Sequence, residues 1–255
     1  MEFEHFAELY SRLKVELQQA VLADPNPYPE QERIQQVNDG SIKLLDAIIL
    51  AELLRARRPQ RILEVGSFVG FSTRWLLEVT RDFASVLTSV DPNLRHRIFD
   101  VPGRILRTLN AEFVGTRLKS REGFFSRVIP GGFYYDYEHY KPCLSRAEMD
   151  RLIRSRPVFN AASFGGECFD FIFIDGDHSE EGALSDFTEA AKVLTPGGCI
   201  AFHDAISWPS VSSAIRKIAL RYGLTATVGI RGSAFRAVLG AGACDGIGTF
   251  VSAAA

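Results

Sequence analysis

A short apolar run followed by two closely spaced glycines constrains the fold of this chain more than any other segment. The run from Ile62 to Val65 predicts a buried parallel strand, and Gly66 and Gly70 follow it in a tight loop. Ser72 or Thr73 is expected to cap the helix that comes next. In such a strand–glycine–helix turn, a ligand lies against bare backbone and the helix N-terminus faces its negative group. The segment therefore predicts a nucleotide-type cofactor site at the carboxyl end of the first strand.

The rest of the chain alternates between strand-like and helix-like segments. The strands expected after the first are 86–90, 117–120, 169–174, 199–202 and a terminal pair within 225–239, joined through Arg231-Gly232. The expected helices are 3–22, 42–57, 92–113, 179–194 and 211–222, with a proline-rich loop at 25–29. Repeated βα units before a terminal β pair predict one α/β domain over residues 1–255, built on a doubly wound, mostly parallel sheet. Residues 1–40 are expected to form a helical extension of this domain.

Composition argues against several classes of partner. A formal charge of −2 and an isoelectric point near 6.2 predict no broad basic surface for nucleic acid. The longest apolar stretch, residues 44–54, is too short to span a bilayer. The four cysteines are widely spaced, with no CxxC pair, so we expect free thiols in the cytoplasm.

The glycine loop departs from the dinucleotide-binding pattern, in which a central glycine lets a pyrophosphate approach. Phe68 stands in the middle of this loop and would obstruct a pyrophosphate, which argues against a nicotinamide-dependent oxidoreductase. Asp91 ends the second strand, where a carboxylate binds both hydroxyls of a ribose. Glu64 adds a second negative group that we expect to face the pocket. Two carboxylates suit a cofactor with a cationic amino-acid part, which points to S-adenosylmethionine.

Polar side chains also follow the fourth and fifth expected strands. Asp175, Asp177 and His178 end the fourth strand, and His203 and Asp204 end the fifth. Because the carboxyl ends of adjacent parallel strands meet at one edge of a sheet, we expect these groups beside the glycine loop. Asp175, His203 and Asp204 would hold one divalent cation there, while Asp177 or His178 reaches a substrate hydroxyl. Oxygen ligands favour Mg²⁺, and a histidine admits Mn²⁺ or another transition ion.

This arrangement predicts methyl transfer to a hydroxyl of a small molecule. A bound cation stabilises an alkoxide and orients it toward the methyl group, and a nearby Asp or His takes the proton. The alternative is a metal-independent N- or O-methyltransferase, in which the two histidines only form hydrogen bonds within a polar strand edge.

The segment Glu64-Val-Gly-Ser-Phe-Val-Gly-Phe-Ser72 resembles motif I of the class I S-adenosylmethionine-dependent methyltransferases. Its aromatic residue in place of the central glycine and its Gly-aromatic-Ser ending are similar to the catechol-O-methyltransferase-like and macrocin-type branch of small-molecule O-methyltransferases. The resemblance covers about residues 40–205. It implies a Rossmann-like, seven-stranded sheet of order 3-2-1-4-5-7-6 with the last strand antiparallel.

The resemblance also implies roles for individual residues. Ser72 would hold the methionine carboxylate, Asp91 the ribose, and the loop from Gly123 to Ser126 the adenine. The implied metal ligands are again Asp175, His203 and Asp204. The base corresponds to Asp177 in macrocin-type enzymes and to His178 in catechol-type enzymes. The full set of expected cofactor-binding residues is Glu64, Gly66, Ser67, Phe68, Gly70, Ser72, Asp91, Gly123, Phe124, Phe125 and Asp175.

Residues 131–167 interrupt the alternation between the third and fourth strands with a cluster of aromatic side chains. Two interpretations remain open. The aromatic residues either pack on the sheet or on a second subunit of a homo-oligomer, or they form a cap over the substrate.

Overall fold

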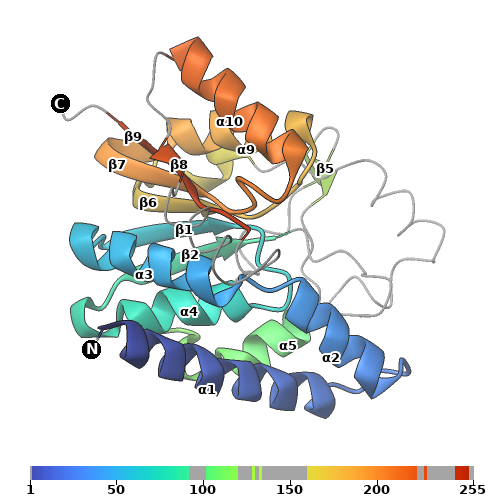
Figure 1. Ribbon diagram of the computed structural model, residues 1–255. Coiled ribbons are helices and arrows are strands. Elements are labelled where there is room, and N and C mark those ends of the chain that lie inside the picture. Colours follow the sequence, from blue (N-terminus) through green and yellow to red (C-terminus); the bar gives the residue numbers. More distant parts are fainter. Residues whose placement is uncertain are drawn as a thin grey trace.

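The computed structural model describes residues 2–91, 102–119, 128–129, 132–133, 160–222, 227–228 and 245–252. Figure 1 shows a central sheet with helices on both of its faces. The α-helices are α1 (Glu2–Ala23), α2 (Glu30–Asp39), α3 (Leu44–Arg57), α4 (Phe71–Val79), α5 (Pro102–Leu109), α9 (Glu180–Lys192) and α10 (Pro209–Tyr222). Short 3₁₀ turns are η1 (Arg81–Phe83), η2 (Ala111–Phe113) and η3 (Ala161–Phe164). None of the described helices is both long and apolar enough to cross a membrane.

The main sheet has seven strands in the order β3-β2-β1-β6-β7-β9-β8. Their bounds are β1 (Arg61–Val65), β2 (Val86–Val90), β3 (Leu118–Lys119), β6 (Phe169–Ile174), β7 (Leu194–Phe202), β8 (Thr227–Val228) and β9 (Gly248–Val251). Numbered along the chain, this is the predicted order 3-2-1-4-5-7-6, and β9 runs antiparallel to both of its neighbours. The predicted fold is thus confirmed. A separate antiparallel pair joins β4 (Val128–Ile129) to β5 (Gly132–Phe133).

Alternation along the central strands builds two apolar cores, one on each face of the sheet. Phe171 and Phe173 of β6 pack into a core with residues of α1, α3, α4 and α5. Ile172 and Ile174 of the same strand point to the opposite face and pack with residues of α9 and α10. Both faces of the parallel strands are therefore covered, which explains why their sequences are almost continuously apolar.

The last strand lies later in the chain than the sequence predicted. The terminal pair was expected within 225–239, but only β8 falls there among the described residues, and the antiparallel strand is β9. The predicted turn at Arg231-Gly232 lies outside the described residues. β9 pairs along β7 from Cys199↔Val251 to Phe202↔Gly248, and this pairing buries Phe250. A four-residue strand ending close to the C-terminus carries too short a pattern to stand out in the sequence.

Two other elements, strand β7 and helix α2, also differ from the prediction. Strand β7 was predicted over 199–202 but begins at Leu194 and includes Pro196, Gly197 and Gly198, with a register shift opposite β6. Helix α2 was not predicted, because the prolines before it indicated a loop. Pro29 immediately precedes the helix. Two glutamates occupy its first turn, where their negative charges interact favourably with the helix dipole. The buried Arg33 of α2 donates to the carbonyl oxygen of Val21 at the end of α1.

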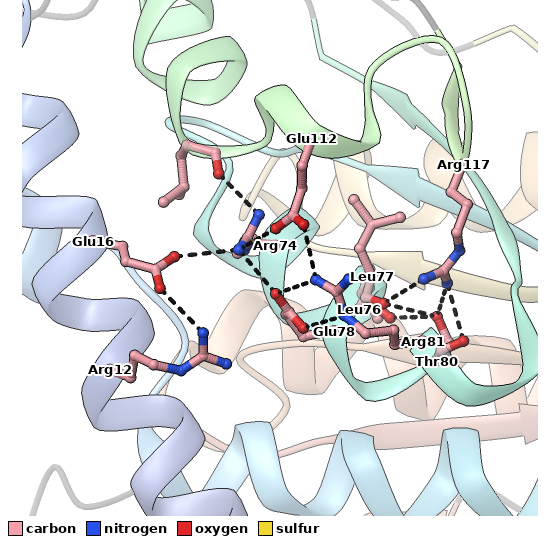
Figure 2. Close-up of polar contacts among 11 residues, drawn as sticks. Arg12, Glu16, Arg74, Leu76, Leu77, Glu78, Thr80, Arg81, Glu112 and Arg117 are labelled. Atoms are coloured by element: carbon pink, nitrogen blue, oxygen red, sulfur yellow. Dashed lines mark hydrogen bonds and ion pairs between the residues drawn. The ribbon is translucent and has the colours of Figure 1, made fainter.

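The N-terminal helix α1 is held to the domain by apolar and ionic contacts. Leu13 and Leu17 are fully buried in the core that α1 shares with α3 and α4. Figure 2 shows the ionic part, in which Arg74 of α4 is bound by Glu16 of α1 at 3.3 Å and by Glu78 at 2.9 Å. Glu112 of η2 contacts the same guanidinium at 2.5 Å. Helix α1 is therefore packed against the same core as α3 and α4.

Candidate active site

The glycine loop packs tightly against the end of β6. Gly66 has a φ of +85°, and a Cβ there would lie 2.1 Å from the carbonyl oxygen of Asp175. Gly70 has a φ of +87°, and a Cβ there would lie 2.5 Å from the Leu106 side chain. Both positions therefore require glycine on grounds of internal packing as well as conformation. The close approach at Gly66 brings the loop to the predicted acidic edge.

The residues after Gly70 do not cap the helix as predicted. Helix α4 already begins at Phe71, and its N-cap is Gly70, with no side-chain capping bond. The hydroxyls of Ser72 and Thr73 instead each donate to Glu64, at 2.6 Å. The capping prediction was wrong because the buried carboxylate of Glu64 requires hydrogen-bond donors, and these two hydroxyls supply them.

Glu64 is fully buried beneath the glycine loop. Besides the two hydroxyls of α4, Ser89 on β2 donates to its Oε2 at 2.8 Å. The carboxylate thus links β1, β2 and the first turn of α4. Sequence reasoning missed the contribution of Ser89, although the register places it directly beside Glu64 on the neighbouring strand.

Asp91 anchors the glycine loop at the end of β2. Its Oδ2 accepts hydrogen bonds from the backbone N–H groups of Ser67 and Phe68, both at 2.9 Å. Phe68 has a φ of +45°, a left-handed conformation in which the two amides converge on one oxygen. The predicted cofactor residues 64–72 and Asp91 are therefore brought together. Gly123, Phe124 and Phe125 lie outside the described residues, as does the aromatic insert apart from residues 132–133 and 160–167.

The predicted acidic edge also forms. Asp175 follows β6 and Asp204 follows β7, and ligand atoms of these two residues and of His178 lie within 4.8 Å of one another. Adjacent residues of a regular strand point to opposite faces, but β7 has ended at Phe202. Asp204 adopts a φ of +56°, which turns its carboxylate back so that Oδ2 lies 3.1 Å from Nδ1 of its neighbour His203.

His178 and His203 contact this edge from two sides. The Nε2 of His178 lies 2.6 Å from Oδ2 of Asp204, and its ring packs on Trp208 with centroids 4.9 Å apart. The Nδ1 of His203 also faces Asp175, with Oδ1 at 3.2 Å. All three predicted metal ligands, Asp175, His203 and Asp204, are thus in contact. Trp208 was not singled out from the sequence.

Asp177 points away from this cluster. Its Oδ1 accepts from the N–H of Ser179 at 2.8 Å, just before helix α9. A Cβ at Gly182 would lie 2.4 Å from its carboxyl carbon, so the side chain lies over the first turn of α9. Of the two base candidates, only His178 has its side chain at the acidic edge.

The electrostatics of the edge favour positive charge. Burial alone would lower the pKa of His178, but its bonds to Asp175 and Asp204 raise that pKa to about 10. Burial likewise opposes charge on His203, yet Asp175 and the other carboxylates hold its pKa well above the usual value. The pKa of Asp204 is lowered by the same contacts in spite of burial. The carboxylates of the edge therefore stabilise positive charge on both histidines.

A glycine loop after the first strand of a 3-2-1-4-5-7-6 sheet, with acidic groups at the ends of the next strands, defines a class I methyltransferase architecture. A family model described as a methyltransferase domain matches residues 63–205, more than half of the chain, and the chain belongs to that family. This removes the oxidoreductase alternative.

Similar proteins agree with this assignment. A provisionally named O-methyltransferase of Mycobacterium sp. (strain JLS) is 24% identical over 188 residues, or 74% of this chain and 68% of that protein. The O-methyltransferase TomG from Streptomyces achromogenes, solved with S-adenosylmethionine, is 20% identical with a TM-score of 0.54, over 93% of this chain and 89% of that one.

An O-methyltransferase from Bacillus cereus, solved with S-adenosylhomocysteine, is 18% identical with a TM-score of 0.51, over 92% and 96% of the two chains. At these identities the solved structures show the fold. The chain is thus confirmed as an S-adenosylmethionine-dependent methyltransferase, as predicted. The relatives described above are O-methyltransferases.

Proposed function

We propose that this methyltransferase transfers the methyl group of S-adenosylmethionine to a hydroxyl of a small molecule, assisted by a divalent ion. One observation carries the proposal: ligand atoms of Asp175, His178 and Asp204 cluster within 4.8 Å of one another, and Asp175 packs against Gly66 of the glycine loop. Cofactor and acceptor sites would then share one edge of the sheet. The O-methyltransferase relatives support oxygen as the acceptor atom. The cytoplasm remains the expected location of the protein.

The cofactor would lie along the glycine loop. Asp91 would bind the ribose hydroxyls and residues 123–125 the adenine. Because the Ser72 hydroxyl donates to Glu64, Ser72 would bind the methionine carboxylate through its backbone N–H in the first turn of α4. Support comes from the rigidity of this end of the site, since two backbone N–H groups fix Asp91 to the loop. A preorganised carboxylate loses little freedom on binding.

The donor set fits a divalent ion. Asp175 and Asp204 supply the carboxylate oxygens that Mg²⁺ and Mn²⁺ prefer, and both neighbouring histidines have raised pKa values because the edge favours positive charge. Asp175 and Asp204 would hold the ion, with His203 the third ligand expected from sequence. When bound, the ion would stabilise the oxyanion of the acceptor.

His178 is the proposed base. Its side chain is 35% exposed, so an acceptor reaches it, while Asp204 and Trp208 orient its ring. An imidazole must be neutral to accept a proton, whereas the carboxylates raise the pKa of His178 to about 10. The base role therefore requires that the charge of Asp175 and Asp204 be neutralised, which links it to the divalent ion.

One observation favours a second candidate, a metal-independent methyltransferase. The 2.6 Å contact between His178 and Asp204 has the form of a His–Asp pair, in which the carboxylate alone orients the imidazole. The two candidates differ in whether Asp204 binds a metal or only His178.

The test combines metal removal with substitution. We expect turnover to disappear in EDTA and to return with Mg²⁺ or Mn²⁺. Asp204→Ala should abolish turnover with S-adenosylmethionine affinity nearly unchanged by calorimetry, whereas Asp82→Ala, at an exposed position, should change neither. His178→Ala should reduce the rate by about 10²–10⁴ and Asp177→Ala by much less. Full activity of a metal-free preparation in EDTA would leave the His178–Asp204 pair as the active site and reject the metal.

A further inference from the structure

A second group of metal-type ligands lies on the far side of the His203 ring. Asp46 of α3 and Asp245, which precedes β9, approach its Nε2, with Oδ2 atoms at 3.8 Å and 4.0 Å. One ligand atom of each of the three residues lies within 4.8 Å of the others. His203 is only 6% exposed and Asp46 is fully buried. The proposed methyl-transfer chemistry uses neither aspartate.

A nitrogen of the His203 ring that lacks a partner is a second, independent observation that points to a bound ligand. Its Nε2 is buried and has no hydrogen-bond partner within the described part of the chain. A buried nitrogen without a partner is unfavourable, because it has lost its hydrogen bonds to water. Its Nδ1, by contrast, faces Asp175 and Asp204 at 3.2 Å and 3.1 Å, where an N–H has acceptors. An imidazole whose one N–H is held by carboxylates presents the lone pair of its other nitrogen, which is the usual arrangement of a metal-binding histidine.

The backbone fixes the two aspartates around this nitrogen. The N–H groups of Asp245 and Gly246 donate to the two oxygens of Asp46, at 2.6 Å and 2.9 Å. Gly246 has a φ of +91°, and a Cβ there would lie 2.5 Å from Ile206. The N–H of Ile206 in turn donates to the carbonyl oxygen of Asp245 at 2.9 Å. Each Asp46 oxygen keeps a lone pair, because a carboxylate oxygen accepts more than one bond.

The surroundings leave this group negative. The hydroxyl of Tyr10 from α1 donates to the carbonyl oxygen of Ile42, at 2.8 Å. Burial raises the pKa of Tyr10, and the charges of Asp46 and Asp245 raise it further, so the phenol stays neutral. Besides His203 itself, Lys43 also lowers the pKa of Asp245, but the Lys43 ammonium is bound by the carbonyl oxygens of Asn38 and Asp39.

We propose that Asp46, Asp245 and Nε2 of His203 bind a second divalent ion, separate from the one assigned to Asp175 and Asp204. Two carboxylates and one imidazole suit Mn²⁺, Fe²⁺ or Zn²⁺ better than Mg²⁺. The ion would tie α3 to the segment before β9. It would also hold the His203 ring so that Nδ1–H fixes Asp175 and Asp204. His203 is then a ligand of this second ion and a positioning residue for the first, in place of a ligand to the first.

Mn²⁺ binding counted by electron paramagnetic resonance tests the proposal. We expect two Mn²⁺ per chain in the native protein and one in Asp245→Asn, with Asp39→Asn as the matched exposed control at two. Asp46→Asn repeats the test from α3, and circular dichroism checks that each variant is folded. In Asp204→Asn, the remaining Mn²⁺ should show coupling to an imidazole nitrogen.

The outcomes separate this proposal from the proposed function. Loss of the only bound Mn²⁺ in Asp245→Asn, with no effect of Asp204→Asn, would support the second site and count against the first. Undiminished Mn²⁺ binding in folded Asp245→Asn and Asp46→Asn would overturn the second site. Absence of nitrogen coupling from the ion retained in Asp204→Asn would also overturn it.

Discussion

Asp204 ends strand β7 in a left-handed conformation, with φ at +56°. Non-glycine residues adopt this conformation at a cost that persists where the surroundings fix it. Here His178 binds its Oδ2 and Ser207 its Oδ1, both at 2.6 Å. These contacts turn two consecutive residues, His203 and Asp204, toward one cluster. The strained backbone conformation of Asp204 thus helps to form the acidic edge on which the proposed chemistry depends.

Asp91 is expected to control cofactor affinity. Asp91→Ala removes the acceptor for the amides of Ser67 and Phe68 and, with it, the proposed ribose contacts. Each charge-assisted bond is worth about 1.5–3 kcal/mol, so calorimetry should show S-adenosylmethionine binding weakened at least tenfold. Asp91→Asn keeps a carbonyl oxygen for the two amides and should lose less. Unchanged affinity in Asp91→Ala would remove Asp91 from the cofactor site.

Among the elements, those specified by local pattern were the most predictable. The strands 86–90 and 169–174 were placed at the observed bounds of β2 and β6, because continuous apolar runs mark buried parallel strands. The helix starting after Ser179 was also found, and Ser179 accepts from the N–H of Gly182 as its cap. Strand β9 was missed because it is stabilised by pairing with β7, which is distant in sequence, and helix α2 was missed because the prolines before it indicated a loop.

The site residues also divide into those that a local sequence pattern predicts and those that depend on contacts distant in sequence. Asp175, His178, His203 and Asp204 could be found because they end adjacent strands, whose carboxyl ends must meet. Asp46 and Asp245 could not be paired from sequence, because 198 residues separate them and β9 was placed elsewhere. The direction of Asp177, away from the edge, depends on a turn before α9 that leaves no distinct signal.

The ionic network between α1 and α4 is predicted to stabilise the N-terminal layer. Arg74→Met leaves Glu16, Glu78 and Glu112 without their shared cation, and Glu78 is buried. We expect the free energy of unfolding to fall by about 3 kcal/mol, measured by urea denaturation. Arg12→Met removes only an exposed contact to Glu16 and should cost less than about 1 kcal/mol. Equal effects of the two substitutions would show that the network is only a surface feature.

For the whole molecule, Asp186 of α9 introduces a dependence of stability on pH. Burial raises its pKa to about 7, and the charge of Asp177 adds to the rise. A raised folded-state pKa gives stability that is complete below the unfolded value of 3.8 and is lost as pH rises through 7. Asp186→Asn should therefore be more stable than the native protein at pH 8, by about 2–4 kcal/mol, and similar to it at pH 4. Thermal denaturation at the two pH values measures this, and a variant equally destabilised at both would contradict it.

The central claim is that cofactor and divalent ion occupy neighbouring sites at one edge of this sheet. A crystal structure of the protein with S-adenosylhomocysteine and Mn²⁺, with anomalous data to locate the metal, tests it most directly. The account predicts S-adenosylhomocysteine on the loop from Gly66 to Gly70 with its ribose on Asp91, and an anomalous peak between Asp175 and Asp204. Cofactor bound elsewhere, or no metal at these two carboxylates in the presence of saturating Mn²⁺, would contradict it.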